Sequence, residues 1–209
     1  MNLLLKIVAA IARGVRREIG ALLMFTVVYF PDDYLGRLLR RLYWKAMLSI
    51  GPQFVIERGA KLGPRHLLTV GDHFKFGEYA EIAVGDAEPE QVWIGNYVSI
   101  ARYTWIRSAN HAFGDTTIPI ALQGHESRSV SFRGKQYSIV IEDDVWIAPN
   151  AVILSGAHIG QGSVIAAGAV VSGPVPPYSV VVGNPGRVAK SRIPKPAGAQ
   201  PPGDGHAKI

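Results

Sequence analysis

An aliphatic residue recurs at every sixth position through much of this chain, and no other feature restricts the possible folds as strongly. The recurring positions are Ile94, Ile100, Ile106, Ile141, Ile147, Ile153, Ile159, Ile165 and Val171. Four positions after them stand mostly small or aliphatic residues, namely Val98, Thr104, Val145, Ala151, Ala157, Ser163, Ala169 and Val175. A period of six matches neither the α-helix nor the alternation of a single strand. The repeat therefore predicts short strands joined by tight turns, with one large and one small side chain pointing inward from each unit.

Three such units close a triangular coil, and stacked coils exchange backbone hydrogen bonds. Hydrophobic strands with accidental spacing are the alternative, but the units from Ile141 to Val175 follow one another without a break. A weaker set precedes them, at Ile56, Leu62, Val70, Phe76 and Ile82. We therefore expect an all-β fold, a parallel β-helix with its repeat over about residues 54–182 and a domain over residues 51–190.

The repeat is interrupted once. Ile106 and Ile141 lie 35 positions apart, which is not a multiple of six, so a loop is inserted between them. We place this inserted loop at residues 111–138; it has no long apolar period and contains Pro119, Gly124 and Gly134. A long loop on a rigid scaffold is commonly functional.

The first 50 residues differ from the repeat, and we expect residues 1–50 to form a helical segment. Apolar residues recur at helical spacing at Leu3, Leu4, Ile7, Val8 and Ile11. The next apolar run, residues 19–30, is shorter than the roughly 20 residues that span a bilayer as a helix. A third stretch, residues 34–48, mixes leucines and aromatics with four basic residues. Such runs suit helices lying on an anionic membrane surface, while packing on the protein's own domain or on a neighbouring subunit remains the alternative.

Composition excludes several classes of protein. Hydrophobic residues make up 48% and charged residues 18%, which excludes global disorder, although the Pro- and Gly-rich tail over residues 191–209 is expected to be disordered. The chain has no cysteine, so disulfides, thiolate zinc sites and a cysteine nucleophile are excluded. The net charge of +6 gathers near the two ends without a nucleic-acid-binding motif, so no nucleic acid partner is expected. The histidines lack the paired spacing of a metal site, so no metal is expected.

Three segments carry a resemblance to a known family: Ser108-Ala-Asn-His111, Ile118-Pro-Ile-Ala-Leu-Gln-Gly124, and the run from Val140-Ile-Glu-Asp-Asp-Val-Trp-Ile147 through Val182-Gly-Asn-Pro185. Together with the repeat, they resemble the hexapeptide-repeat acyltransferase superfamily. The match is closest to the branch that O-acetylates polysaccharides and sugars, related to maltose and galactoside acetyltransferases. The resemblance implies a left-handed parallel β-helix, whereas general chain chirality would favour the other hand.

The same resemblance implies transfer of an acetyl group from acetyl-coenzyme A to a sugar hydroxyl, in a bacterial surface polysaccharide or its lipid-linked precursor. His111 matches the superfamily's catalytic histidine, and an imidazole suits a general base. Asp115 is the candidate that orients it, with a backbone carbonyl as the alternative. Glu78 and Glu81 could bind the acceptor or orient the histidine, or form a solvated edge. Gln123 could line the substrate groove or cap a turn.

Five further residues match positions that hold the acetyl donor in the superfamily: Trp146, Ala148, Ala167, Arg187 and Lys190. The tryptophan would lie beside the donor groove, the alanines would bond pantetheine through their backbone, and the two cations would meet the phosphates. Relatives usually carry a lysine just before an acidic-Pro-Pro turn, whereas this chain reads Ser172-Gly-Pro174.

Two other classes stay open, namely an N-acetyltransferase acting on an amino-sugar or a drug, and a non-catalytic scaffold. The resemblance also implies a homotrimer with active sites shared between subunits. Combined with the N-terminal segment, it predicts a cytoplasmic protein held peripherally at the inner face of the cytoplasmic membrane.

Overall fold

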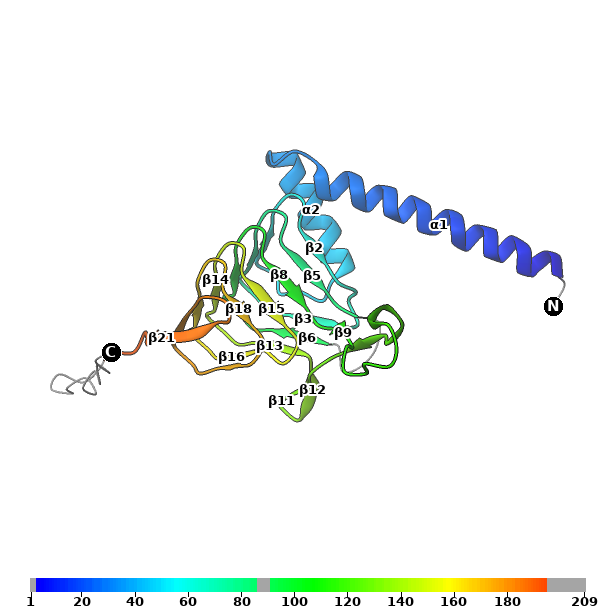
Figure 1. Ribbon diagram of the computed structural model, residues 1–209. Coiled ribbons are helices and arrows are strands. Elements are labelled where there is room, and N and C mark those ends of the chain that lie inside the picture. The colour runs from blue at the N-terminus through cyan, green and yellow to red at the C-terminus, as the bar shows by residue number, and fades with distance from the viewer. Residues whose placement is uncertain (1–2, 86–90, 195–209) are drawn as a thin grey trace.

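The computed structural model describes residues 3–85 and 91–194, and it consists of two N-terminal helices followed by a triangular β-helix (Figure 1). The tail beyond residue 194, which the sequence predicts to be disordered, lies outside the described residues. Successive turns of the β-helix stack so that each coil contributes one short strand to each of three sheets (Figure 1).

The three sheets are numbered by the order in which the chain enters them. The first sheet joins β1 (Phe54–Ile56), β4 (Phe74–Phe76), β7 (Ser99–Ile100), β14 (Trp146–Ile147), β17 (Val164–Ile165), β20 (Ser179–Val182) and β21 (Arg187–Ser191). The second sheet joins β2 (Lys61–Leu62), β5 (Glu81–Ala83), β8 (Trp105–Arg107), β15 (Val152–Leu154) and β18 (Val170–Val171). The third sheet joins β3 (Leu68–Val70), β6 (Val92–Ile94), β13 (Ile139–Ile141), β16 (His158–Ile159) and β19 (Pro174–Val175). Within these sheets the strands pair in parallel, except that β21 returns antiparallel to β20.

The core is a column of the repeated side chains inside the triangle. Every recurring aliphatic position from Ile94 to Val171 is at most 4% exposed. The smaller residues that follow them are also buried, because a triangular coil leaves room for only one large side chain in each unit. The parallel β-helix predicted from the six-residue period is therefore confirmed.

The inserted loop leaves the β-helix after β8 and returns at β13. It contains β9 (Asn110–His111), a 3-10 turn (Ile120–Leu122), β10 (His125–Glu126), β11 (Val130–Phe132) and β12 (Lys135–Tyr137). Strands β9 and β10 pair antiparallel, and β11 and β12 form a hairpin. The hairpin packs back on the third sheet, where the ring centroids of Phe132 and Trp93 are 4.8 Å apart.

The N-terminal segment forms two helices, α1 (Leu3–Tyr29) and α2 (Tyr34–Met47), so the first two apolar runs of the sequence make one continuous helix. Trp44 of α2 and Leu48, together with Val28 of α1, belong to the core of the β-helix. These residues cover the open end of the first coil, which an isolated solenoid would expose to water.

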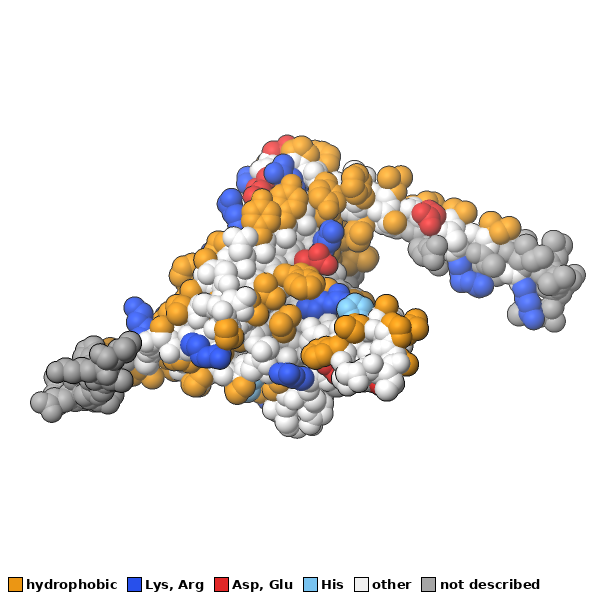
Figure 2. All heavy atoms as spheres, viewed as in Figure 1, with side chains coloured by type: hydrophobic (Ala, Val, Ile, Leu, Met, Phe, Trp, Pro, Cys, Tyr) orange, Lys and Arg blue, Asp and Glu red, His pale blue; other side chains and the backbone are white. Residues whose placement is uncertain are grey.

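The rest of α1 projects away from the β-helix as a single helix (Figure 1). Its exposed apolar side chains include Ile11, Val15, Ile19, Leu22, Leu23 and Phe25. Apolar side chains of α1 are visible along one side of the projecting helix (Figure 2). Among the described residues, no helix combines the length and the apolar character that crossing a bilayer requires.

Asp33 caps the N-terminus of α2, and its side chain accepts a hydrogen bond from the Gly36 N–H at 2.7 Å. Asp33→Ala is expected to lower the free energy of unfolding by about 1 kcal/mol, because it removes an acceptor from the first helical turn. Asp33→Asn keeps a side-chain oxygen and is expected to lose less. Urea unfolding followed by circular dichroism measures both, and equal losses in the two variants would contradict the capping role.

Candidate active site

Three serines tie the inserted loop to the β-helix directly before His111. The Ser108 carbonyl accepts hydrogen bonds from the hydroxyls of Ser127, at 2.7 Å, and of Ser138. The Ser108 hydroxyl accepts the Gly85 N–H at 3.0 Å. Because Ser108 is fully buried, these bonds fix the point at which the loop leaves the second sheet.

His111 lies three residues after Ser108, at the edge of this group of hydrogen-bonded serines. His111 lies on β9 and faces His125 on β10 in the antiparallel ladder. Their rings stack, with centroids 4.7 Å apart and an interplanar angle of 30°. Both residues are exposed, so the His111 ring is open to solvent while its backbone is fixed. This combination suits a group that must accept a proton from an incoming molecule.

Asp115 and Gln123 hold the loop together rather than contacting His111. The Asp115 carboxylate accepts hydrogen bonds from the Thr117 N–H at 2.8 Å and from the Thr117 hydroxyl at 2.6 Å. The Gln123 side chain bonds the Asp115 N–H and carbonyl, at 3.1 and 2.7 Å, and the Ile118 carbonyl at 3.0 Å. Gln123 thus makes the turn-capping contacts that the sequence left as one alternative. No hydrogen bond joins Asp115 to His111 among the described residues, and the orienting role stays a prediction.

Two hydrogen bonds from Thr117 hold the pKa of Asp115 below its ordinary value. The bond from the Thr117 side chain has the larger effect and the bond from its backbone N–H the smaller. A lowered pKa means that this contact helps order the loop at neutral pH and is lost as the pH falls through the lowered pKa. Thr117→Val, which removes the hydroxyl, is expected to raise the pKa of Asp115 toward its ordinary value, while Thr117→Ser is expected to preserve the shift. Carboxyl-carbon NMR titration measures it, and an unchanged pKa in Thr117→Val would contradict the assignment.

Glu81 lies on the outer face of the second sheet, between Lys61 and Trp105 in the parallel register. Glu78, at the preceding corner, is held by Arg58, with 3.7 Å between the guanidinium nitrogen and the carboxylate oxygen. Both carboxylates are half-buried.

The structure adds three residues that the sequence did not single out, namely Trp105, Arg107 and His125. Trp105 is 42% exposed on the outer face of the second sheet, with the Arg107 guanidinium 5.9 Å from its ring centroid. The position of Trp105 next to the inward-facing Ile106 makes it outward-facing, so the period could have identified it. His125 could not be found this way, because its contact with His111 depends on a pairing within an irregular loop.

The residues matched to the acetyl-donor site lie mainly on the first sheet. Trp146 is 50% exposed on its outer face. Register across the sheet aligns Trp146 with Val164, Val164 with Val180, and Val180 with Lys190. With strands about 4.8 Å apart, Trp146 and Lys190 are roughly 14 Å apart along one outward-facing row. Arg187 begins the last strand of the same sheet and is exposed.

The two alanines lie in different surroundings. Ala148 is buried; its N–H donates to the Ile165 carbonyl at 2.8 Å, and its carbonyl accepts the Thr104 hydroxyl at 3.3 Å. Its backbone amide is therefore committed to the ladder between coils. Ala167 is exposed at a corner.

A family model matches part of the repeat. Residues 138–173 match the model of the bacterial transferase hexapeptide (six repeats). The chain is 36% identical over 99 residues to a probable acetyltransferase of Mycobacterium tuberculosis, covering 47% of this chain and 30% of that protein. It is 52% identical over 52 residues to the 2,3,4,5-tetrahydropyridine-2,6-dicarboxylate N-acetyltransferase of Staphylococcus aureus, covering 25% of this chain and 22% of that one. The aligned segments thus span less than a third of either curated relative.

Solved structures match over more of the chain. A maltose O-acetyltransferase from Clostridium difficile is 25% identical, with a TM-score of 0.64 over 84% of this chain and 85% of that one. A hexapeptide-repeat acetyltransferase from Vibrio cholerae, complexed with acetyl-coenzyme A, is 25% identical, with a TM-score of 0.56 over 82% and 84%. These matches confirm the resemblance to the hexapeptide-repeat acyltransferases, and the fold is their left-handed parallel β-helix.

Proposed function

We propose that this protein transfers an acetyl group from acetyl-coenzyme A directly to a hydroxyl of a sugar in a bacterial surface polysaccharide or its lipid-linked precursor. The observation that carries the proposal is the solvent-open imidazole of His111, held at the base of an inserted loop on a hexapeptide-repeat β-helix. The likeness to a maltose O-acetyltransferase supports a sugar hydroxyl as the acceptor.

In the proposed reaction, His111 removes the proton of the sugar hydroxyl while the oxygen attacks the thioester carbonyl carbon. The C–O bond forms, the C–S bond breaks, and the imidazolium returns its proton to the departing thiolate. Products are the sugar acetate and the free thiol of coenzyme A. Backbone N–H groups at a coil corner would stabilise the negative charge that develops on the carbonyl oxygen.

Trp146, Ala148, Ala167, Arg187 and Lys190 would hold acetyl-coenzyme A. The outward row from Trp146 to Lys190 supports this, because it offers an exposed aromatic ring and a cation on one sheet face. The Ala148 N–H is already hydrogen-bonded within the ladder between coils. The Ala148 carbonyl, which also accepts the Thr104 hydroxyl, would therefore be the group that bonds pantetheine.

Acceptor binding would use Glu78, Glu81 and Gln123, and Asp115 would orient His111. Trp105 extends this set, since an exposed aromatic face beside Glu81 suits stacking against a sugar ring.

In a homotrimer with shared active sites, these groups would meet the donor groove of a neighbouring subunit. Light scattering on the purified chain tests that assembly, and a monomer at all concentrations would contradict it.

N-acetylation of an amino-sugar or small amine is the second candidate function. The similarity to an N-acetyltransferase of Staphylococcus aureus over 52 residues favours it. The match spans 25% of this chain and 22% of that protein, so it does not discriminate between oxygen and nitrogen acceptors.

The test incubates the purified full chain with labelled acetyl-coenzyme A and matched acceptors: a sugar, its amino-sugar counterpart and a surface polysaccharide. Hydroxylamine then cleaves O-acetyl esters and leaves N-acetyl amides. Hydroxylamine-labile label on the sugar or polysaccharide is the expected result. Stable label on the amino-sugar alone would replace the proposal with the second function, and acetyl-coenzyme A binding without transfer to any acceptor would favour a scaffold.

The protein would act at the inner face of the cytoplasmic membrane, with α1 lying on the bilayer surface. The exposed apolar residues of α1 between Ile11 and Phe25 support this, as does the basic balance of the chain. Flotation with vesicles measures it, and Leu22→Glu combined with Phe25→Glu is expected to reduce the bound fraction.

A further inference from the structure

A groove runs between α2 and the first sheet. It consists of two adjoining hollows of about 340 Å³ and about 410 Å³, which share Arg41, Phe54 and Val55. We call it the α2 groove; its walls include Tyr34, Arg37, Leu38, Arg41, Val55 and Lys75. It is built from α2, β1 and β4, whereas His111 follows β8 of the second sheet. Lys75 of the groove continues the outward-facing row of the first sheet through Ser99 to Trp146, so the groove adjoins the first-coil end of that row and does not include the residues from Trp146 to Lys190.

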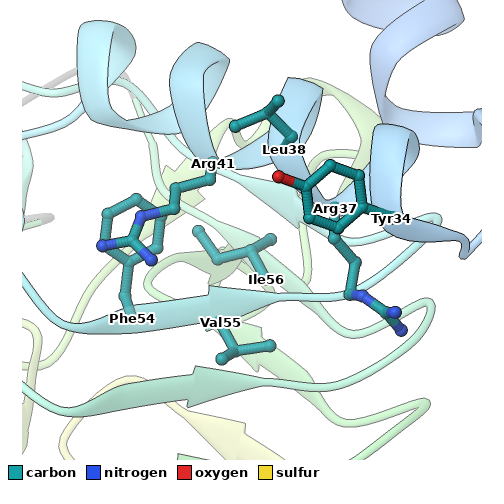
Figure 3. Close-up of a pocket in the computed structure, with 7 residues that line it drawn as sticks. All are labelled: Tyr34, Arg37, Leu38, Arg41, Phe54, Val55 and Ile56. Atoms are coloured by element: carbon teal, nitrogen blue, oxygen red, sulfur yellow. The ribbon is translucent and has the colours of Figure 1, made fainter.

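The floor and one wall of the α2 groove are apolar. Phe54 and Ile56 are buried beneath it, and Val55 between them points outward and is 46% exposed. Leu38, 40% exposed, and Tyr34 reach over the same strand from α2 (Figure 3). An outward-facing valine and leucine that remain exposed in this way form a surface against which an apolar chain can pack.

The margins of the α2 groove are cationic. Arg37 and Arg41 extend from α2 on opposite sides of Val55 (Figure 3). Lys75 pairs with Val55 in the strand register and lines the second hollow together with Arg41. The Arg41 guanidinium lies 5.9 Å from the Phe54 ring centroid, and its hydrogen bond to the Pro52 carbonyl is long at 3.4 Å.

Within the described part of the chain, none of these three cations has an acidic partner. Nearby acids are bonded to other groups. Asp32 pairs with the buried Arg40, and Asp33 caps α2. The Asp72 carboxylate, at the margin of the second hollow, accepts the Gln53 and His73 N–H groups, and Glu57 accepts the Glu78 N–H. The groove thus offers unneutralised positive charge beside apolar surface, which is complementary to an anionic amphiphile.

We propose that the α2 groove binds a single anionic membrane phospholipid. Arg41 and Lys75 hold the headgroup phosphate in the second hollow, and the start of an acyl chain lies over Val55, Leu38 and Tyr34 in the first. The ligand comes from the membrane, because a soluble phosphate has no apolar chain that could pack against the apolar wall of the groove. The exposed Leu35 and Leu42 on α2, and the exposed apolar residues of α1, continue the same kind of surface. The inference extends the proposed membrane contact and does not depend on acetyl transfer.

The experiment titrates the full chain with dihexanoyl phosphatidylglycerol below its micelle concentration, using calorimetry. Saturable binding is expected for the wild type, at least about tenfold tighter than for glycerol 1-phosphate, which lacks the chains. Arg41→Gln combined with Lys75→Gln is expected to weaken binding by about tenfold or more, from the loss of two headgroup cations. Arg102→Gln combined with Lys135→Gln removes the same charge from exposed positions outside the groove, and is expected to leave binding within about twofold.

Four results would overturn the proposal. They are absent binding in the wild type, equal loss in both double variants, glycerol 1-phosphate or coenzyme A binding as tightly as the lipid, and dihexanoyl phosphatidylcholine binding as tightly as phosphatidylglycerol. Circular dichroism checks that each variant is folded. Acetyl transfer to a soluble acceptor is measured in parallel and is expected to be unchanged in both double variants. Failure of transfer with retained lipid binding would overturn the proposed function alone, and the reverse would overturn the lipid site alone.

Discussion

His111→Ala is expected to lower the rate of acetyl transfer by about 10² to 10⁴, the contribution that a positioned general base typically makes. The substitution leaves the fold intact, because the His111 side chain is exposed and β9 is anchored through the buried Ser108. The measurement is release of the coenzyme A thiol in the presence of a sugar acceptor, at saturating acetyl-coenzyme A.

His125→Ala is the matched control, since it removes the other ring of the stacked pair from the facing strand. It is expected to cost less than about tenfold, because His125 would support the His111 ring without accepting the proton. Binding of acetyl-coenzyme A is expected to be unchanged in both variants. If His125→Ala abolished transfer while His111→Ala did not, the general base would be His125.

Ile147→Ala is expected to destabilise the β-helix by about 2–5 kcal/mol in the free energy of unfolding. Ile147 is fully buried in the first sheet, between the coils that contribute β7 and β17, so truncation leaves a cavity that the stacked coils cannot close. The measurement is the urea midpoint and slope of the full chain, followed by circular dichroism.

Ile147→Val provides the graded control, because it removes one methylene from the same site and is expected to cost about 0.5–1.5 kcal/mol. Trp146→Phe, on the outward-facing neighbour, is expected to have a smaller effect than Ile147→Ala. A loss in Ile147→Ala no larger than that in Ile147→Val would contradict the packed-column description of the core.

The β-helix could be predicted because the six-residue period identifies which side chains point inward. Ile94, Ile147 and Ile165 are far apart in the chain, yet each occupies the same place in its unit and each is buried. Handedness was different, since the spacing is compatible with either hand and only the resemblance indicated the left-handed form. The N-terminal helices were visible in the apolar pattern, but the burial of Trp44 against the first coil was not, because both faces of that stretch carry leucines and aromatics.

Less of the candidate site could be predicted. His111 was identified through its match to a catalytic histidine, but its stacking on His125 arises from a local antiparallel pairing within the loop, for which the sequence has no regular pattern. Gln123 bonds the backbone at Asp115 and Ile118, a geometry fixed by the turn rather than by residue type. The α2 groove joins Arg41 to Lys75 across 34 positions of sequence, and such a charged surface exists only once the helix has packed on the sheet.

The most direct test of the proposed acetyl transfer is proton NMR of O-acetyl groups on the surface polysaccharide of the source organism. It compares a strain lacking the gene with strains complemented by the wild type or by His111→Ala at matched protein level. Acetate is predicted to disappear on deletion and to return only with the wild type. Unchanged acetate in the deletion strain, with no second acetyltransferase acting on the same polymer, would contradict the proposed function; restoration by His111→Ala would contradict the assigned base.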